Sequence, residues 1–201
     1  MLPEQIVYLS LLISVVPFYL YTRNTIRGTT KPNLVTWFFW ALAPLIGTYL
    51  QLKAGAGLSV LPVFLAGFFP LIIFIVALTS RNGHWRLTTF DVLCGVFSFF
   101  ALILWILTTR TDVSIFFAIL ADGLAAVPTI TKSWKFPETE TAVGYLPGVL
   151  NNILGLLVIK NWNFSIASFG IYFIVLNLLL MAIIWRKNFF YRNKLTTELT
   201  Q

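Results

Sequence analysis

One acidic residue and a pair of carboxamides interrupt the most apolar parts of this sequence. Asp122 lies inside the run 112–131, and the neighbours Asn151 and Asn152 lie inside the run 142–160. A carboxyl group can bind a proton or a cationic part of a ligand, whereas carboxamides bind neutral polar groups through hydrogen bonds. Such side chains at apolar positions predict a polar binding site inside an otherwise apolar protein.

The composition indicates a protein whose surroundings are mostly lipid. Of its 201 residues, 58% are hydrophobic and 10% are charged, against roughly 25% charged residues in a soluble domain. A membrane-spanning helix needs about 20 predominantly apolar residues. Seven stretches fit that length: 5–22, 34–52, 58–79, 88–108, 112–131, 142–160 and 164–185. We therefore expect an all-α membrane protein, a single bundle of seven transmembrane helices without a separate soluble domain.

The basic residues are distributed unevenly between the expected loops. Alternate loops and the C-terminal segment hold eleven of the 14 Lys and Arg residues, and the other loops hold only Lys53, Arg110 and Lys160. Basic loops usually face the cytoplasm. This predicts an integral, multi-pass protein of a bacterial inner (plasma) membrane, with its N-terminus outside and its C-terminus in the cytoplasm. The basic residues behind the net charge of +7 would then lie near lipid headgroups, and no nucleic-acid partner is expected.

The expected depth of Asp122 leaves two interpretations open. Near the bilayer midplane an aspartate costs about 2.5–3.5 kcal/mol on insertion scales, so such residues usually face a bundle interior or a water-filled path. Asp122 is either a proton-coupling or substrate-binding group, or a carboxyl that only ties helices together. Asn177, in the run IVLNLLLM, is likewise either a structural amide or a site residue.

The predicted binding set adds one aromatic residue to these polar side chains. Asn151 and Asn152 point about 100° apart on a helix, so they cannot both serve one neighbouring helix, and at least one is expected to face a cavity. Trp40 lies one turn inside its helix from Trp37 and packs either on a ligand or in the core. The predicted substrate-binding residues are Trp40, Asp122, Asn151, Asn152 and Asn177.

The first and last thirds of the sequence share a pattern of prolines and glycines. An offset of 111 aligns Pro17 with Pro128, and after the charged turn an offset of 108 aligns Gly47 with Gly155. The pattern predicts four segments: a three-helix repeat at 1–80, a linker helix in 81–111, a second three-helix repeat at 112–187 and a cytoplasmic tail at 188–201. A single linker helix gives both repeats the same orientation, and parallel repeats bind substrate near the midplane between them.

Four prolines are candidate hinges in this arrangement. Pro17, Pro44, Pro128 and Pro147 lie on the first two helices of the two predicted repeats. A proline removes one helical hydrogen bond and favours a bend, which would let a path open and close.

This organisation resembles that of the SWEET and PQ-loop transporters over about residues 5–187. The resemblance rests on three helices, a linker helix and three further helices, with an outside N-terminus and prolines on the first two helices of each repeat. It implies a sugar-type site lined by Trp40 and Asn152, with Asn151 beside it. It also implies that Asp122, on the first helix of the second repeat, couples transport to protons.

The sequence departs from that superfamily at its prolines. Neither Pro17 nor Pro128 is followed by the Gln of the Pro-Gln dipeptide, and Pro147 aligns with Phe39 rather than with Pro44. Specificity for sugars therefore does not follow from the resemblance.

The leading functional prediction is a small polar-solute transporter that works by alternating access, with Asp122 as the proton-coupling group. The alternative is a non-transporting membrane receptor or assembly protein, whose contact surface would be the basic tail and the turn 132–140. An enzyme is not expected, because the sequence holds no HExxH motif, intramembrane His or CxxC pair.

The single cysteine and the single histidine bear on whether a metal or cofactor is expected, and the lipid environment bears on the expected partners. Cys94 and His84 each lack a second ligand or redox partner, so neither a metal nor a cofactor is expected. The predicted partners are the lipid bilayer and a small polar solute. The oligomeric state, a homo-oligomer included, is left open.

Overall fold

The part of the chain that the computed structural model describes, residues 3–80 and 83–198 with side chains up to residue 186, is entirely helical. Its α-helices are α1 (Leu9–Ile26), α2 (Leu34–Lys53), α3 (Leu61–Thr79), α4 (Thr89–Leu107), α5 (Thr111–Lys135), α6 (Leu146–Leu157) and α7 (Phe164–Glu198). Short 3-10 segments are η1 (Glu4–Tyr8), η2 (Gly57–Val60), η3 (Pro137–Thr139) and η4 (Ala142–Tyr145). The predicted all-helical architecture is thereby confirmed.

Six of these helices, some with a 3-10 turn in front, are long and apolar enough to cross a membrane. The remaining helical stretch, Ala142–Leu157, which is the sixth along the chain, is shorter than these six spans. Exposed Phe97, Phe99 and Phe100 on α4 fit a face in contact with lipid, where apolar surface carries no hydration cost. The chain is therefore an integral, multi-pass membrane protein.

The sixth helical stretch, Ala142–Leu157, begins where the expected run 142–160 begins, but its first turn is the 3-10 turn η4 and its end comes earlier. α6 has 12 residues, and Pro147 lies in its first turn, after the 3-10 turn η4. The ring of a proline fits the first turn, where its missing N–H leaves no carbonyl unpaired. Pro17, Pro44 and Pro128 lie inside helices, whereas Pro147 lies in the first turn of α6, directly after η4.

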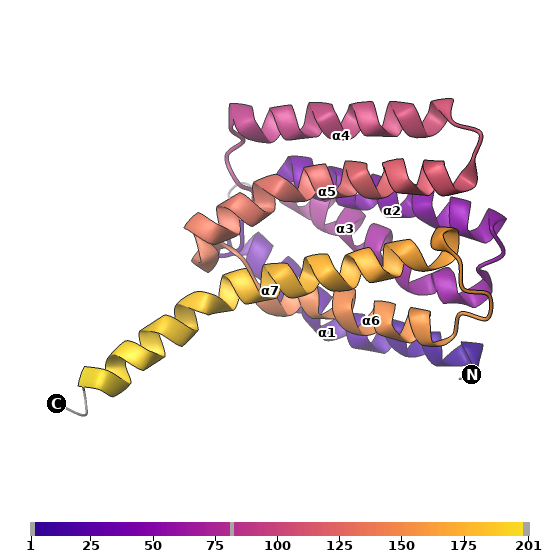
Figure 1. The fold of residues 1–201 in the computed structure, drawn as a ribbon. Helices are drawn as coiled ribbons and strands as arrows, with labels where there is room; N and C mark the ends of the chain where they lie inside the picture. Colours follow the sequence, from indigo (N-terminus) through magenta and orange to yellow (C-terminus); the bar gives the residue numbers. More distant parts are fainter. Residues whose placement is uncertain (1–2, 81–82, 199–201) are drawn as a thin grey trace.

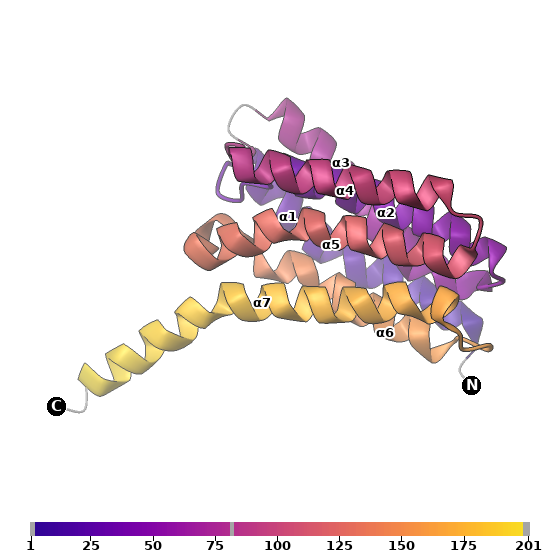
Figure 2. The same ribbon diagram turned by 45° about the horizontal axis from the view of Figure 1, so that its top comes forward.

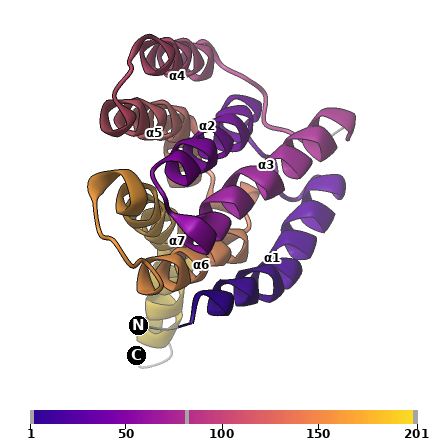
Figure 3. The same cartoon turned by 90° about the vertical axis from the view of Figure 1, so that its right-hand side faces the viewer.

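The helices pack as a bundle with α4 at one edge (Figures 1 and 3). α3 packs on both α1 and α2, and α7 packs on both α5 and α6. Between these groups, α1 packs on α6 and α2 packs on α5. Figure 2 shows α4, α5 and α7 side by side across one face of the bundle, with α4 also touching α2.

Two ends of the bundle carry the loops. We call the end with residues 27–33, 83–88 and 136–141 the basic end, and the end with residues 54–60, 108–110 and 158–163 the opposite end. α7 continues past the bundle at the basic end (Figure 1), so it runs through most of the segment expected as a separate tail. Residues 199–201 of that expected tail lie outside the described residues.

The start of α4 gives Asp91 a local structural role. Thr88 Oγ1 accepts a hydrogen bond from the Asp91 N–H, and the Asp91 carboxylate accepts one from the Thr88 N–H. This reciprocal pair is a capping box, which satisfies two donors that a helix start leaves unpaired. Asp91 therefore explains where α4 begins rather than where a ligand binds.

Candidate functional site

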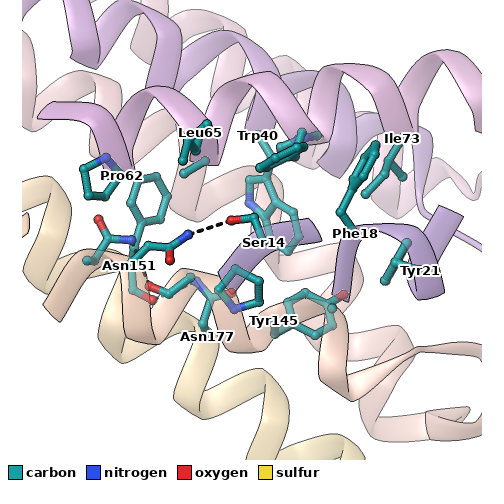
Figure 4. Close-up of a pocket in the computed structure, with 18 of the residues that line it drawn as sticks. Ser14, Phe18, Tyr21, Trp40, Pro62, Leu65, Ile73, Tyr145, Asn151 and Asn177 are labelled. Atoms are coloured by element: carbon teal, nitrogen blue, oxygen red, sulfur yellow. Dashed lines mark hydrogen bonds between the residues drawn. The ribbon is translucent and has the colours of Figure 1, made fainter. Parts of the chain in front are cut away.

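A pocket of about 100 Å³ lies between α1, α2, α3, α6 and α7 (Figure 4). We call it the central pocket. Its polar and aromatic lining includes Ser14, Tyr21, Trp37, Trp40, Tyr145, Asn151, Asn152 and Asn177. Apolar side chains of α1, α3 and α7, two prolines of α3 and one of α6 contribute to the rest of the wall. Four of the five predicted substrate-binding residues, Trp40, Asn151, Asn152 and Asn177, are thus brought together.

The neighbouring amides Asn151 and Asn152 both line the central pocket, and each has one anchored and one free end. Asn151 Nδ2 donates to Ser14 Oγ at 2.8 Å, which ties α6 to α1 (Figure 4), and Asn152 Nδ2 donates to the Gly148 carbonyl at 2.8 Å. Both carboxamide oxygens are buried without a hydrogen-bond partner in the described residues. A buried unpaired acceptor costs about 1–3 kcal/mol, so these oxygens are suited to accept hydrogen bonds from a ligand or from water.

Asn177 reaches the central pocket because α6 and α7 approach each other closely. A Cβ on Gly148 would overlap the carboxamide of Asn177, so only glycine leaves room for this contact. Asn177 Nδ2 donates to the Phe173 carbonyl at 2.8 Å. Asn177 therefore lines the central pocket, while its amide nitrogen is hydrogen-bonded within α7.

Two tryptophans supply donors to the same pocket. The Trp37 and Trp40 rings lie edge to face, with centroids 5.4 Å apart, and both indole N–H groups are buried without a partner in the described residues. An indole N–H only donates, whereas a carboxamide oxygen only accepts. The pocket therefore presents both kinds of hydrogen-bonding group beside aromatic faces.

The lining of the central pocket carries no charge in the part of the chain that the structure describes. An ion in such a site would lose its hydration without gaining a counter-charge, which is strongly unfavourable. The arrangement can bind a compact, neutral solute through hydrogen bonds and stacking.

Asp122, the fifth predicted site residue, does not line the central pocket. It is fully buried, Oδ2 accepts a hydrogen bond from the Tyr172 hydroxyl at 2.7 Å, and Oδ1 has no partner among the described residues. Its helix, α5, packs on α2, α4 and α7, while the pocket is enclosed by α1, α2, α3, α6 and α7. The expected meeting of Asp122 with the amides is therefore not observed.

A second buried acid, Glu140, lies at the end of the turn 132–140, the expected contact surface of a receptor or assembly protein. Glu140 Oε2 accepts hydrogen bonds from the Tyr21 hydroxyl at 2.7 Å and from the Tyr145 hydroxyl at 2.9 Å. Glu140 Oε1 forms a buried ion pair with Lys132 Nζ, which also donates to the Lys31 carbonyl. Since Lys132 and Glu140 are 3% and 8% exposed, these two side chains offer no surface to a partner protein.

A sequence signal for this cluster did exist. Thr129, Lys132 and Ser133 are spaced by three and four residues, so they share one face at the end of α5. All three are buried, and Thr129 Oγ1 donates to Thr36 Oγ1 of α2 at 3.0 Å. That spacing indicates a polar face packed against another helix, but it does not identify Glu140 as the partner.

Taken together, the site is a neutral pocket with free donors and acceptors, and a charged cluster at its basic end. Tyr21 and Tyr145 belong to both, because they line the pocket and bind Glu140. The described residues hold no group of three or more His, Cys, Asp or Glu residues that could bind a metal ion. No protein-family model, curated protein or solved structure matches this chain.

Proposed function

We propose that this protein transports a small, uncharged polar solute across the membrane by alternating access. The observation that carries the proposal is the central pocket, whose unpaired Asn151 and Asn152 oxygens and Trp37 and Trp40 N–H groups are enclosed by membrane helices. A site of this kind in the middle of a bundle is where transporters bind their substrates.

Helix packing supports the proposal of two repeats, α1–α3 and α5–α7, joined by α4. In each group the third helix packs on the first and on the second. Between the groups, α1 packs on α6 and α2 packs on α5. If α1 is swapped with α5 and α2 with α6, each of these two pairs becomes the other. This pairing is what a two-fold relation between parallel repeats requires.

The aligned glycines support the same relation at the level of side chains. A Cβ on Gly47 of α2 would overlap the ring of Phe169 on α7, and a Cβ on Gly155 of α6 would lie 3.0 Å from Pro62 Cγ on α3. Each glycine thus permits the second helix of one group to approach the third helix of the other.

The proposed movement is a rocking of one repeat against the other. Pro17, Pro44 and Pro128 interrupt the hydrogen bonding inside α1, α2 and α5, which is where bending is favoured. The excess of Lys and Arg at the basic end supports a cytoplasmic location for that end. The prolines and the orientation are among the features on which the resemblance to SWEET and PQ-loop transporters rests, so that resemblance remains part of the proposal.

Asp122 is the proposed proton-binding group, separate from the solute. Its burial, and the absence of a basic partner or a metal-binding cluster around it among the described residues, favour a proton as its ligand. Tyr172 binds Asp122, and the adjacent Phe173 lines the central pocket. A change at Asp122 would therefore reach the solute through α7.

The test is uptake of a panel of labelled uncharged sugars and polyols by proteoliposomes, with and without a pH gradient. We expect saturable uptake of at least one neutral solute, and reduced uptake by Asn151→Leu in protein that is folded and monodisperse. Ser168→Ala, on α7 outside the central pocket, is the control variant and should transport normally. Absence of saturable uptake across the panel by folded wild-type protein would contradict the proposal.

A further inference from the structure

Three loops at the basic end are tied to one another by hydrogen bonds. The Lys31 N–H donates to the Thr139 carbonyl at 3.0 Å, and the Trp85 N–H donates to the Pro32 carbonyl at 2.9 Å. The Thr30 and Thr141 hydroxyls also form a hydrogen bond with each other. The connections α1–α2, α3–α4 and α5–α6 therefore close this end of the bundle together.

Glu140 joins this closed end to the central pocket. Its Oε2 binds one tyrosine from α1, Tyr21, and one from η4, Tyr145. The two rings lie edge to face with centroids 6.2 Å apart, and both line the pocket. A Cβ on Gly144 would overlap the Tyr21 ring, so glycine at that position lets α1 press against η4. One carboxylate thus holds together two elements that both line the pocket.

In this closed arrangement the charge of Glu140 is fully compensated. Its side chain is fully buried, as is nearly all of the Lys132 side chain. Lys132 Nζ is itself fixed by the Lys31 carbonyl and lies 5.6 Å from the centre of the Trp85 ring. A buried carboxylate with complete partners favours one geometry, because any movement that removes a hydroxyl donor leaves a buried acceptor unpaired.

The opposite end contains a much weaker counterpart. There Glu4 of η1 pairs with Lys160, but the side chains are 29% and 67% exposed. Exposed pairs contribute little, since water and salt compete for both charges. The two ends therefore differ in how firmly they are held.

We propose that Glu140 is a latch that keeps the central pocket shut at the basic end. Opening separates Tyr21 from Tyr145 and removes both hydroxyl donors from the carboxylate, while Lys132 remains beside it on α5. This proposal rests on the proposed function in one respect, because opening of the latch would let a solute pass.

The experiment measures access to a thiol inside the pocket. In a Cys94→Ala background, Ala66→Cys places a thiol on the pocket wall of α3. A membrane-impermeant methanethiosulfonate reagent is added to proteoliposomes, and labelling of Lys135→Cys or Asn161→Cys reports which end of the protein faces the reagent. Both reporter positions are exposed, one near each end.

Two latch variants are compared at the basic end. Lys132→Gln with Glu140→Gln removes both charges, so no unpaired charge remains. Tyr21→Phe with Tyr145→Phe keeps the ion pair but removes both hydroxyls. We expect either variant to label at least about tenfold faster than the parent, because hydrogen bonds to a charged group contribute about 1.5–3 kcal/mol each. Glu4→Gln, at the opposite end, is the control and should leave this rate unchanged.

Unchanged labelling in the tyrosine variant, in protein that is folded and monodisperse, would overturn the latch, whether or not the charge variant folds. A faster rate in Glu4→Gln equal to that in the latch variants would overturn it too. If the latch variants label faster while wild-type protein takes up no solute, the latch stands and the proposed transport function fails. The two inferences are therefore tested separately.

Discussion

The surroundings of Asp122 and of Glu140 show two ways to bury a carboxylate in one bundle. Asp122 lies on α5 with a single hydrogen-bond donor, Tyr172, and one oxygen unpaired among the described residues. Glu140 has the ammonium of Lys132 and two tyrosine hydroxyls. A partnered acid holds one geometry, whereas an acid with few partners is free to gain or lose a proton without breaking a network. The first arrangement suits coupling, and the second suits closure.

The largest expected effect is a loss of stability when Glu140 is replaced. Glu140→Leu leaves Lys132 buried without a counter-charge, so we expect the free energy of unfolding in detergent to fall by about 3–5 kcal/mol. The double variant Lys132→Leu with Glu140→Leu should recover a large part of that loss, since no buried charge remains. A single variant as stable as wild type would show that the ion pair does not hold the basic end.

Glycines beside the two regions give a matched pair of smaller effects. Gly148→Ala should destabilise the fold by about 1–3 kcal/mol, because its Cβ overlaps Asn177 at the central pocket. Gly123→Ala, next to Asp122, brings its Cβ only into ordinary contact with Tyr172, 3.6 Å from the hydroxyl and 3.8 Å from Cε2, and should stabilise α5 by up to about 1 kcal/mol. Chemical unfolding of both variants measures this difference. Equal effects would mean that α6 and α7 are not closely packed at the pocket.

Asp122→Asn is expected to change coupling rather than folding. The carboxamide oxygen can still accept the Tyr172 hydrogen bond and carries no charge, so stability should stay within about 1 kcal/mol of wild type. Uptake should continue but lose its dependence on the pH gradient. The measurement is initial uptake rate across external pH, and a pH profile identical to that of wild type would remove Asp122 from the coupling mechanism.

The smallest expected effect is at the opposite end. Glu4→Gln breaks a partly exposed ion pair with Lys160, so the unfolding free energy should change by less than about 1 kcal/mol. Thermal unfolding at low and high salt measures it. A loss as large as that of Glu140→Leu would contradict the asymmetry between the two ends.

Hydropathy in the sequence was sufficient to predict the helices. The six long spans begin and end close to the expected runs, because each run must satisfy its own backbone hydrogen bonds in lipid. The exception is the sixth stretch, Ala142–Leu157, which begins at the expected residue but is shorter than the other six. Its first turn is the 3-10 turn η4, with Pro147 in the first turn of α6, and an apolar window does not distinguish a 3-10 turn from an α-helix.

The candidate site was predictable only in part. Trp40, Asn151, Asn152 and Asn177 are polar or aromatic residues at apolar positions, and the pocket gathers all four. The direction in which Asp122 points depends on which helices surround α5, and that depends on long-range packing. Glu140 was missed for the same reason.

The most direct test of solute binding in the central pocket compares variants of that pocket and of Asp122 in one uptake assay. Initial uptake of the neutral solute found in the panel is measured at saturating pH gradient for wild type, Asn152→Leu and Asp122→Asn. Asn152→Leu should lower the apparent affinity about tenfold or more, since it removes a buried hydrogen-bond acceptor from the pocket. Asp122→Asn should leave that affinity within about threefold of wild type. The reverse result, with affinity lost in Asp122→Asn and kept in Asn152→Leu, would contradict the claim that solute binds in the central pocket.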